Sequence, residues 1–277
     1  MIFENSPLPW VAPKKMRFWK LRFAVKALWI VFITFALMIP FLMLRHGQRI
    51  FGVRHSEHAI YRIWGKLSWF GFSIKPRIYG TPIKGDGLIV ANHSNWLDIP
   101  LLFGSVGGFM VSKADVKDWP VIGFFARILG TQFVDRKRSN SKAHADALLD
   151  RMVQGERMVF FPEGTSTDGL RVLPFRSTLF EAAVQSLPEK YVQPVTIFYY
   201  PPEGASPNFF GWWGEMSFAD SIIAIVALPK RQVAEVHFHE PILIGTDRKA
   251  LAKQCEAVVV AKFRELLEAR EGRHWDQ

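Results

Sequence analysis

The stretch Leu88-Ile89-Val90-Ala91-Asn92-His93-Ser94-Asn95-Trp96-Leu97-Asp98 contains the change of pattern on which the fold assignment depends. Its first four residues are continuously apolar, which is typical of a strand buried on both faces of a parallel sheet. Polar residues follow at once, so we expect His93 at the carboxyl end of this strand, where open α/β sheets form ligand crevices. Asp98 then lies near the expected start of a helix.

Beyond residue 71, short β-like runs alternate with helical stretches. Strands are expected near residues 74–79, 88–91, 109–112, 132–135, 158–161 and 192–199. Helices are expected near Pro100 and over residues 121–129, 142–154, 175–185, 212–228 and 247–271. This alternation predicts an α/β fold with a mixed, mostly parallel sheet flanked by helices.

The N-terminal part has a different character. The segment from Ala27 to Leu44 carries no charge and is close to the minimum length that crosses a bilayer. Basic residues flank it on both sides, so the positive-inside rule gives no orientation, and Pro40 is expected to kink or end the helix. This apolar segment and the helically spaced tryptophans over residues 56–70 together predict a membrane-embedded helical hairpin that dips into one leaflet. The alternative is that the apolar segment is a buried helix of a soluble core.

We therefore divide the chain into a membrane-anchoring hairpin, residues 1–70, and a second domain, residues 71–277. The 277 residues are 49% hydrophobic, which is enough for one sizeable core and excludes a disordered protein. Cys255 is the single cysteine, so internal disulfides and cysteine-rich zinc sites are excluded and a reducing compartment is favoured.

The net charge of +10 favours anionic lipid headgroups or an acidic protein partner, and a well-solvated basic surface is the alternative. A nucleic-acid partner is disfavoured, because the basic residues cluster around an apolar span and no recognition motif is present.

His93 and Asp98 form a candidate catalytic pair. A carboxylate bonded to one ring nitrogen holds a neutral imidazole in one tautomer and leaves the other nitrogen to take a proton from a hydroxyl. No Gly-x-Ser-x-Gly motif is present and Cys255 is far along the chain, so we expect the substrate's own hydroxyl to be the nucleophile. The alternative is a histidine that only stabilises a helix start.

A second polar block, Phe161-Pro162-Glu163-Gly164-Thr165, follows another apolar strand, so Glu163 is expected at the same edge of the sheet as His93. Pro162 fixes the entry to the turn, and Gly164 lets the backbone approach a ligand closely. The block can offer a carboxylate, hydroxyls and backbone amides to a polar headgroup.

These two blocks resemble the His-four-residues-Asp and Phe-Pro-Glu-Gly-Thr signatures of the glycerolipid acyltransferase family, which includes lysophosphatidic acid acyltransferase. Residues 130–136, which end in Arg136, and residues 193–195 resemble two further blocks of the family in the same order. The resemblance covers roughly residues 70–200, and four ordered blocks are more specific than any one of them.

The resemblance implies acyl transfer from a thioester of coenzyme A or acyl carrier protein to the free hydroxyl of a lysolipid, with no metal and no other cofactor. The acceptor ranked first is 1-acylglycerol 3-phosphate. In this scheme His93 is the general base and Asp98 its orienting partner. The residues expected to place the acceptor are Arg136, Phe161, Pro162, Glu163, Gly164 and Thr165. We expect the catalytic domain on the cytoplasmic side of the inner membrane.

The sequence departs from the family where an arginine usually follows Gly-Thr, because Ser166-Thr167-Asp168-Gly169 stands there. A bidentate phosphate donor is therefore missing. Arg171 and Arg176 can replace it, and we prefer Arg176, which lies at an expected helix start. The same four residues resemble family members that acylate lyso-ornithine lipid, whose headgroup is an amino acid. That acceptor is the alternative, and a non-catalytic lipid-binding module is a remote one.

Two other groups of residues have simpler interpretations. His237 and His239 share one face of an expected strand with Glu235, which is a conceivable metal triplet, although surface histidines are the preferred interpretation. Trp212 and Trp213 are expected to be interfacial membrane anchors.

Overall fold

The computed structural model describes residues 17–51, 57–85, 87–120, 122–134, 141–186 and 190–272. The strands are β1 (Ile74–Tyr79), β2 (Gly87–Ala91), β3 (Phe109–Lys113), β4 (Gln132–Val134), β5 (Arg157–Phe160), β6 (Tyr191–Tyr199), β7 (Gln232–Phe238) and β8 (Ile242–Leu243). They form one sheet in the order β1-β7-β6-β2-β5-β3-β4, and β8 also pairs with β6. The segment from β6 to β4 is parallel, whereas β7 and β8 are antiparallel to β6. The prediction of a mixed, mostly parallel sheet is confirmed.

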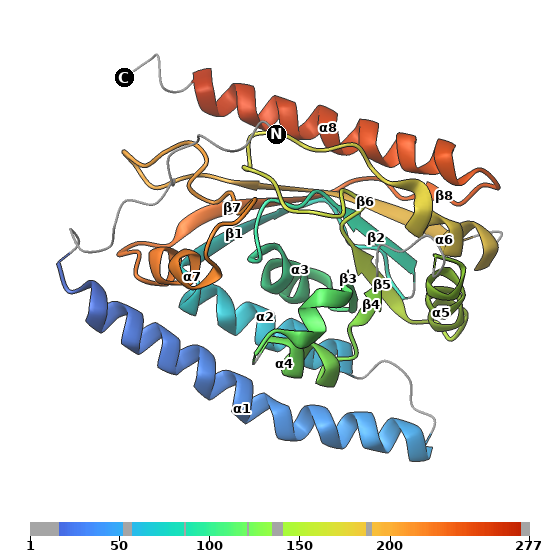
Figure 1. The fold of residues 1–277 in the computed structure, drawn as a ribbon, viewed down its shortest axis with the longest axis horizontal. Helices are drawn as coiled ribbons and strands as arrows, with labels where there is room; N and C mark the ends of the chain where they lie inside the picture. The colour runs from blue at the N-terminus through green and yellow to red at the C-terminus, as the bar shows by residue number, and fades with distance from the viewer. Residues whose placement is uncertain are drawn as a thin grey trace.

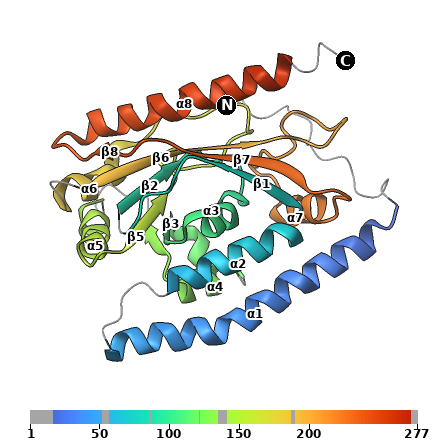
Figure 2. The same cartoon turned by 180° about the vertical axis from the view of Figure 1, so that it is seen from behind.

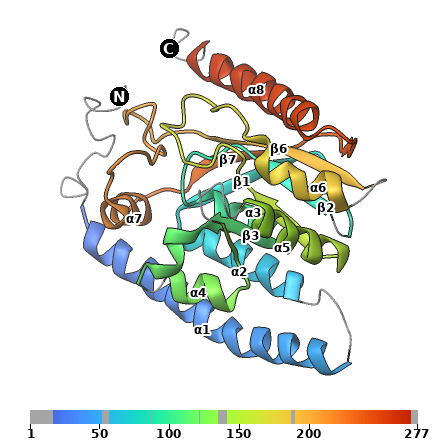
Figure 3. The ribbon, with the colours of Figure 1, turned by 45° about the vertical axis from the view of Figure 1, so that its right-hand side comes forward.

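The helices are α1 (Trp19–Phe51), α2 (Glu57–Gly71), α3 (Asp98–Val106), α4 (Ile122–Ile128), α5 (Ser141–Val153), α6 (Phe180–Ser186), α7 (Phe218–Val226) and α8 (Arg248–Gly272). Figure 1 shows α8 along one face of the sheet, with α3, α2 and α1 stacked in that order on the other face. The view from behind shows the same layers (Figure 2). From the side, α1 is the outermost layer, beyond both α2 and α4 (Figure 3).

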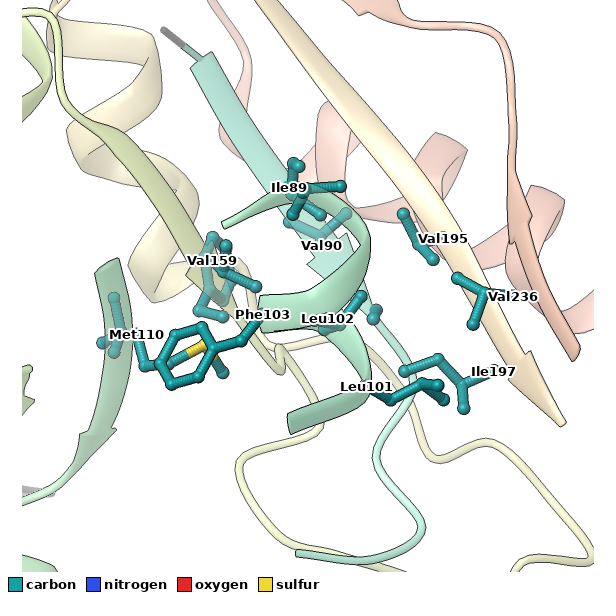
Figure 4. Close-up of a cluster of buried hydrophobic side chains, with 14 of the residues drawn as sticks. Ile89, Val90, Leu101, Leu102, Phe103, Met110, Val159, Val195, Ile197 and Val236 are labelled. Atoms are coloured by element: carbon teal, nitrogen blue, oxygen red, sulfur yellow. The ribbon is translucent and has the colours of Figure 1, made fainter. Parts of the chain in front are cut away.

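Helix α3 packs on the centre of the sheet and is almost entirely buried. Leu101 and Leu102 are at most 1% exposed, and burying each stabilises the fold by about 1.5–3 kcal/mol. Figure 4 shows Leu101 of α3 beside Ile197 of β6, and Phe103 beside Met110 of β3. Because Asp98 is the first residue of α3, this packing also fixes the position of its carboxylate.

Two glycines allow α2 and α3 to cross closely. A β-carbon added to Gly65 would lie 2.1 Å from the backbone nitrogen of Gly104, and one added to Gly104 would lie 2.2 Å from the Trp69 ring. Near this crossing, Ile60 and Tyr61 of α2 join the main hydrophobic core. The second helix of the predicted hairpin is thus built into the core of the sheet domain.

Helix α1 exposes most of its apolar surface. Within the candidate span Trp19–Gly47, an 18-residue window has a mean hydropathy of 2.5, and 11% of that window is buried within the protein. The large apolar side chains exposed on α1 include Leu21, Val25, Leu28, Val31, Phe32, Phe35, Ile39, Leu42, Met43 and Leu44. Such exposure disfavours the soluble-core alternative and indicates membrane association. Pro40 does not end the helix, which continues to Phe51.

The N-terminal half of α1 makes polar contacts with the end of α7. The Lys26 ammonium donates to the Leu228 carbonyl and to Ser73 Oγ, both at 2.7 Å, while Arg22 Nε donates to the Ala227 carbonyl at 3.0 Å. Carbonyls at a helix C-terminus lack intrahelical donors, and cations are favoured there. These two cations therefore tie α1 to the sheet domain.

Two sequence expectations need correction. The helix expected over residues 212–228 begins only at Phe218, because Ser217 caps it by accepting from the Asp220 amide. Trp213 is 8% exposed and lies among core residues, so it is not available as an interfacial anchor. The helix expected over residues 247–271 is present as α8, which buries one side against the sheet, including Cys255, whose thiol pKa is raised to about 12 by burial.

Candidate active site

Three neighbouring parallel strands, β6, β2 and β5, end at the same edge of the sheet. His93 follows β2 and Glu163 follows β5, while Tyr199 is the last residue of β6. Because parallel strands have their carboxyl ends at the same edge of a sheet, polar residues at those ends lie close together. Segments that are far apart in the sequence therefore meet here.

Asp98 is fully buried and surrounded by hydrogen-bond donors. Its Oδ2 accepts from His93 Nδ1 at 2.8 Å and from the backbone amides of Ser94 and Asn95 at 2.8 and 3.0 Å. Its Oδ1 accepts from the Tyr199 hydroxyl at 2.7 Å. The position at the start of α3 also favours a negative charge. The carboxylate is therefore held in one orientation toward the His93 ring.

The His93 ring is positioned on two sides. An ionised carboxylate only accepts hydrogen bonds, so the contact with Asp98 places the ring proton on Nδ1 and leaves the lone pair on Nε2. The ring stacks on Phe161, with centroids 4.1 Å apart and planes 11° apart. It is 17% exposed, and no hydrogen bond from a described residue occupies Nε2. This nitrogen is available to a substrate hydroxyl.

Glu163 connects the two sequence blocks. Its Oε1 accepts from the backbone amide of His93 at 2.6 Å, and its Oε2 accepts from the amide of Leu173 at 2.7 Å. Burial raises the pKa of its carboxyl to about 8, although both amide hydrogen bonds act in the opposite direction. With 1% of its surface exposed, Glu163 holds the loops together in this structure. A contact between its carboxylate and the acceptor headgroup stays a prediction.

Backbone hydrogen bonds link the same loops further. The Thr167 amide donates to the His93 carbonyl at 3.0 Å, and the Trp212 amide donates to the carbonyls of Ser94 and Thr167 at 2.9 and 3.1 Å. Asn95 Nδ2 donates to the Phe210 carbonyl at 2.6 Å. The two blocks therefore belong to one rigid site.

Arg176 lies over the turn of the second block. Gly164 has a φ of +70°, and a β-carbon built there would be 3.5 Å from the Nε and Cζ atoms of Arg176. The Arg176 side chain is exposed, and its amide donates to the Pro162 carbonyl at 2.9 Å. Arg171 instead pairs with Asp168 at 2.9 Å. Arg176 thus lies beside this turn, and its role in binding the acceptor stays a prediction.

The other residues that were expected to place the acceptor occupy different positions around the turn. Phe161 supports the His93 ring, Pro162 is buried and Thr165 is half-buried in the turn. Arg136 lies outside the described residues.

Glu235 and His237 bond to each other at 2.9 Å, whereas His239 Nε2 lies 2.8 Å from Thr196 Oγ1. Within the described chain, no three potential ligands gather into a metal site.

An apolar cavity of about 460 Å³ lies between α1 and the sheet domain. It is lined by residues from α1, α2, α3, β3 and α4, and most of the lining side chains are hydrocarbon. Ile99, the neighbour of Asp98, is part of its wall. The cavity wall therefore includes the residue next to Asp98 on α3.

Tyr199 and Asn92 are two residues of this site that local sequence patterns do not predict. Asn92 joins β2 to β6, because its side chain donates to the Ile197 carbonyl at 2.9 Å and accepts from the Ile197 amide at 2.8 Å. For Tyr199, a hydroxyl at the end of a buried strand, where it needs a hydrogen-bond partner, was the signal that could have been used.

This arrangement of a buried carboxylate, an oriented imidazole and an adjoining apolar cavity is that of an acyltransferase with a His–Asp pair. The Acyltransferase family profile matches residues 74–198. The chain is 45% identical over 186 residues to a lyso-ornithine lipid O-acyltransferase of Rhodobacter capsulatus, covering 66% of this chain and 67% of that one. Over 247 residues it is 36% identical to the protein of the same name from Brucella abortus, covering 83% and 88%. This chain belongs to the glycerolipid acyltransferase family.

Two further similarities are more distant. A 1-acyl-sn-glycerol-3-phosphate acyltransferase of Neisseria gonorrhoeae is 32% identical over 126 residues, covering 44% of this chain and 49% of that one. The crystal structure of the LPA acyltransferase PlsC from Thermotoga maritima superposes with a TM-score of 0.62 at 21% identity, covering 90% of this chain and 97% of that chain. At that identity the likeness shows a shared fold.

Proposed function

We propose that this protein is a membrane-bound O-acyltransferase that moves an acyl group from a thioester to the free hydroxyl of lyso-ornithine lipid. The observation that carries the reaction is the His93–Asp98 pair, with Nε2 open beside the turn of Phe161–Thr165. The acceptor is supported by the two relatives named lyso-ornithine lipid O-acyltransferase and by the residues Ser166-Thr167-Asp168, which stand where an arginine would favour phosphate.

In this mechanism His93 Nε2 takes the proton of the acceptor hydroxyl while the oxygen attacks the thioester carbonyl. Asp98 stabilises the imidazolium that forms, and its fixed orientation keeps the ring in place. When the tetrahedral intermediate collapses, the carbon–sulfur bond breaks and the imidazolium returns the proton to the leaving thiolate. The products are the acylated lipid and the free thiol of the donor.

The surroundings of the pair agree with this reaction. The apolar cavity beside Ile99 can accept an acyl chain, and the exposed apolar face of α1 can hold the site close to lipids. We propose acyl carrier protein or coenzyme A as the donor. We also propose that residues 1–70 anchor the enzyme to the inner membrane, with residues 71–277 on its cytoplasmic side.

A second acceptor, 1-acylglycerol 3-phosphate, is the one that the sequence ranked first. It is supported by Arg176, an exposed cation over Gly164 that can bind a phosphate, and by the Neisseria relative. It ranks second here because the relatives with longer matches are named for the ornithine lipid.

The test uses the purified full-length chain in lipid vesicles, with each acceptor and each thioester donor supplied separately. Lipid mass spectrometry of the products should show acylation of lyso-ornithine lipid. Acylation of 1-acylglycerol 3-phosphate alone would replace the acceptor by the second candidate. His93→Ala should lose at least about a hundredfold in rate. A His93→Ala protein with unchanged function would indicate the lipid-binding module instead.

A further inference from the structure

Tyr199 makes a direct contact with the candidate catalytic pair that the proposed mechanism does not explain. Its hydroxyl donates to Asp98 Oδ1 at 2.7 Å from the end of β6, about a hundred residues along the chain from α3 (sequence separation 101). The Tyr199 side chain is 7% exposed, and its ring stacks on Phe210 with centroids 5.1 Å apart and planes 26° apart. The hydroxyl therefore approaches the carboxylate from a fixed, dry position.

The two oxygens of Asp98 have different partners. Oδ2 receives the His93 ring nitrogen and two backbone amides, whereas Tyr199 is the donor that the described structure gives to Oδ1. A buried carboxylate oxygen without a donor is unfavourable, so this hydroxyl stabilises the rotamer in which Oδ2 faces His93. It also draws part of the carboxylate charge toward Oδ1, away from the imidazole.

Tyr199 can act as a donor over the whole working pH range. Burial raises its phenol pKa well above the ordinary value, and the nearby Asp98 charge adds to this effect. The other titratable side chains at this place are His93 itself and the buried Glu163, which bonds to the His93 amide, with Asp168 close to Glu163. Tyr199→Phe leaves these three side chains in place, so a change at the His93 ring reports on the Asp98 carboxylate that Tyr199 contacts.

We propose that Tyr199 is a positioning residue of the acyl transfer reaction, because its hydroxyl fixes both the orientation and the charge distribution of the Asp98 carboxylate that holds His93. The inference rests on the proposed role of His93 as general base. It differs from a purely structural role, in which the phenol would only satisfy its own hydrogen bond in the core. A structural role affects stability alone, whereas a positioning role also affects the imidazole.

The experiment compares Tyr199→Phe with Tyr200→Phe. The Tyr200 ring packs against Phe198 in the small cluster on the α8 side of the sheet, so this control removes a phenol next in sequence but away from Asp98. In Tyr199→Phe we expect kcat to fall about tenfold while KM for the acceptor stays within about twofold. The acid limb of the kcat/KM profile should move up by about half a pH unit, because a carboxylate that loses a donor favours the imidazolium more strongly.

A second measurement needs no substrate. The pKa of His93 is read by NMR titration of labelled histidine in detergent micelles, and its resonance is assigned by its loss in His93→Gln. It should rise in Tyr199→Phe and stay unchanged in Tyr200→Phe. If the wild-type enzyme acylates neither acceptor, the proposed function fails, and this titration still decides the inference about Tyr199.

Fluorotyrosine at position 199 serves if Tyr199→Phe does not fold, because it keeps the ring and hydroxyl but donates more strongly. It should lower the His93 pKa, which is the opposite shift. An unchanged His93 titration in every folded variant, or an equal loss of kcat in Tyr200→Phe, would overturn the proposal.

Discussion

The backbone amide of His93 donates to Oε1 of Glu163 at 2.6 Å, across 70 positions of sequence. The bond joins the residue that presents the imidazole to the residue at the centre of the second block. The other carboxylate oxygen of Glu163 holds the Leu173 amide, so a third loop is fixed at the same time. The two blocks are thus neighbours through a main-chain contact that substitution of the His93 side chain alone leaves in place.

Asp98→Asn tests the orientation of the imidazole. An asparagine that turns its amide nitrogen toward His93 Nδ1 favours the wrong tautomer, in which Nε2 carries the proton and cannot act as a base. We expect kcat to fall by about a hundredfold or more while thermal unfolding shows a folded protein. Acyl transfer within tenfold of the wild type would contradict the assigned role of Asp98.

Glu163→Gln should change how stability depends on pH. The Glu163 pKa of about 8 in the folded protein exceeds the ordinary 4.5, so the folded chain binds this proton more tightly than the unfolded chain. Its contribution to the unfolding free energy is fully present below pH 4.5 and is lost as the pH rises to about 8. Chemical denaturation across this range should therefore show a smaller decline in Glu163→Gln than in the wild type.

Glu268→Gln is the matched control, since Glu268 is exposed on α8. It should leave the pH dependence as in the wild type. Parallel curves for the wild type and Glu163→Gln would show that Glu163 does not carry this linkage.

Arg176→Ala should weaken acceptor binding. The exposed guanidinium over Gly164 can bind an anionic group of the headgroup, and losing such a contact is expected to raise the acceptor KM about tenfold with little change in kcat. Steady-state kinetics with both acceptors measure this effect. Arg264→Ala, at an exposed position of α8, removes the same charge and should leave KM unaltered, so equal effects of the two variants would remove Arg176 from the site.

Gly65→Ala tests the close crossing of α2 and α3. The added methyl group would lie 2.1 Å from the Gly104 nitrogen. Because that atom belongs to the backbone of α3, the clash can be relieved only by moving α3 away from α2. We expect a loss of about 1–3 kcal/mol in unfolding free energy, measured by denaturant titration. Gly245→Ala is the control, because no atom lies within 4 Å of its added β-carbon. An equal effect of the two variants would contradict the tight crossing.

Local patterns of apolar and polar residues in the sequence predicted much of the fold. The apolar runs at Leu88–Ala91 and Met158–Phe161 predicted buried parallel strands, and β2 and β5 pair in parallel as expected. The error at residues 212–228 has a local cause: an apolar, tryptophan-rich segment looks helical, yet Ser217 caps the helix and the Trp212 amide bonds to the carbonyls of Ser94 and Thr167. Apolar composition alone does not separate a buried loop from a helix.

The sequence by itself determined the contact between His93 and Asp98, because the two residues are five positions apart and their contact needs only a strand, a turn and a helix start. It likewise determined the apolar α1 and the basic charge. The tertiary structure alone decided that Glu163 faces the His93 backbone and that Tyr199 reaches Asp98. Such contacts depend on strand order and register, and local periodicity carries no information about which strands become neighbours.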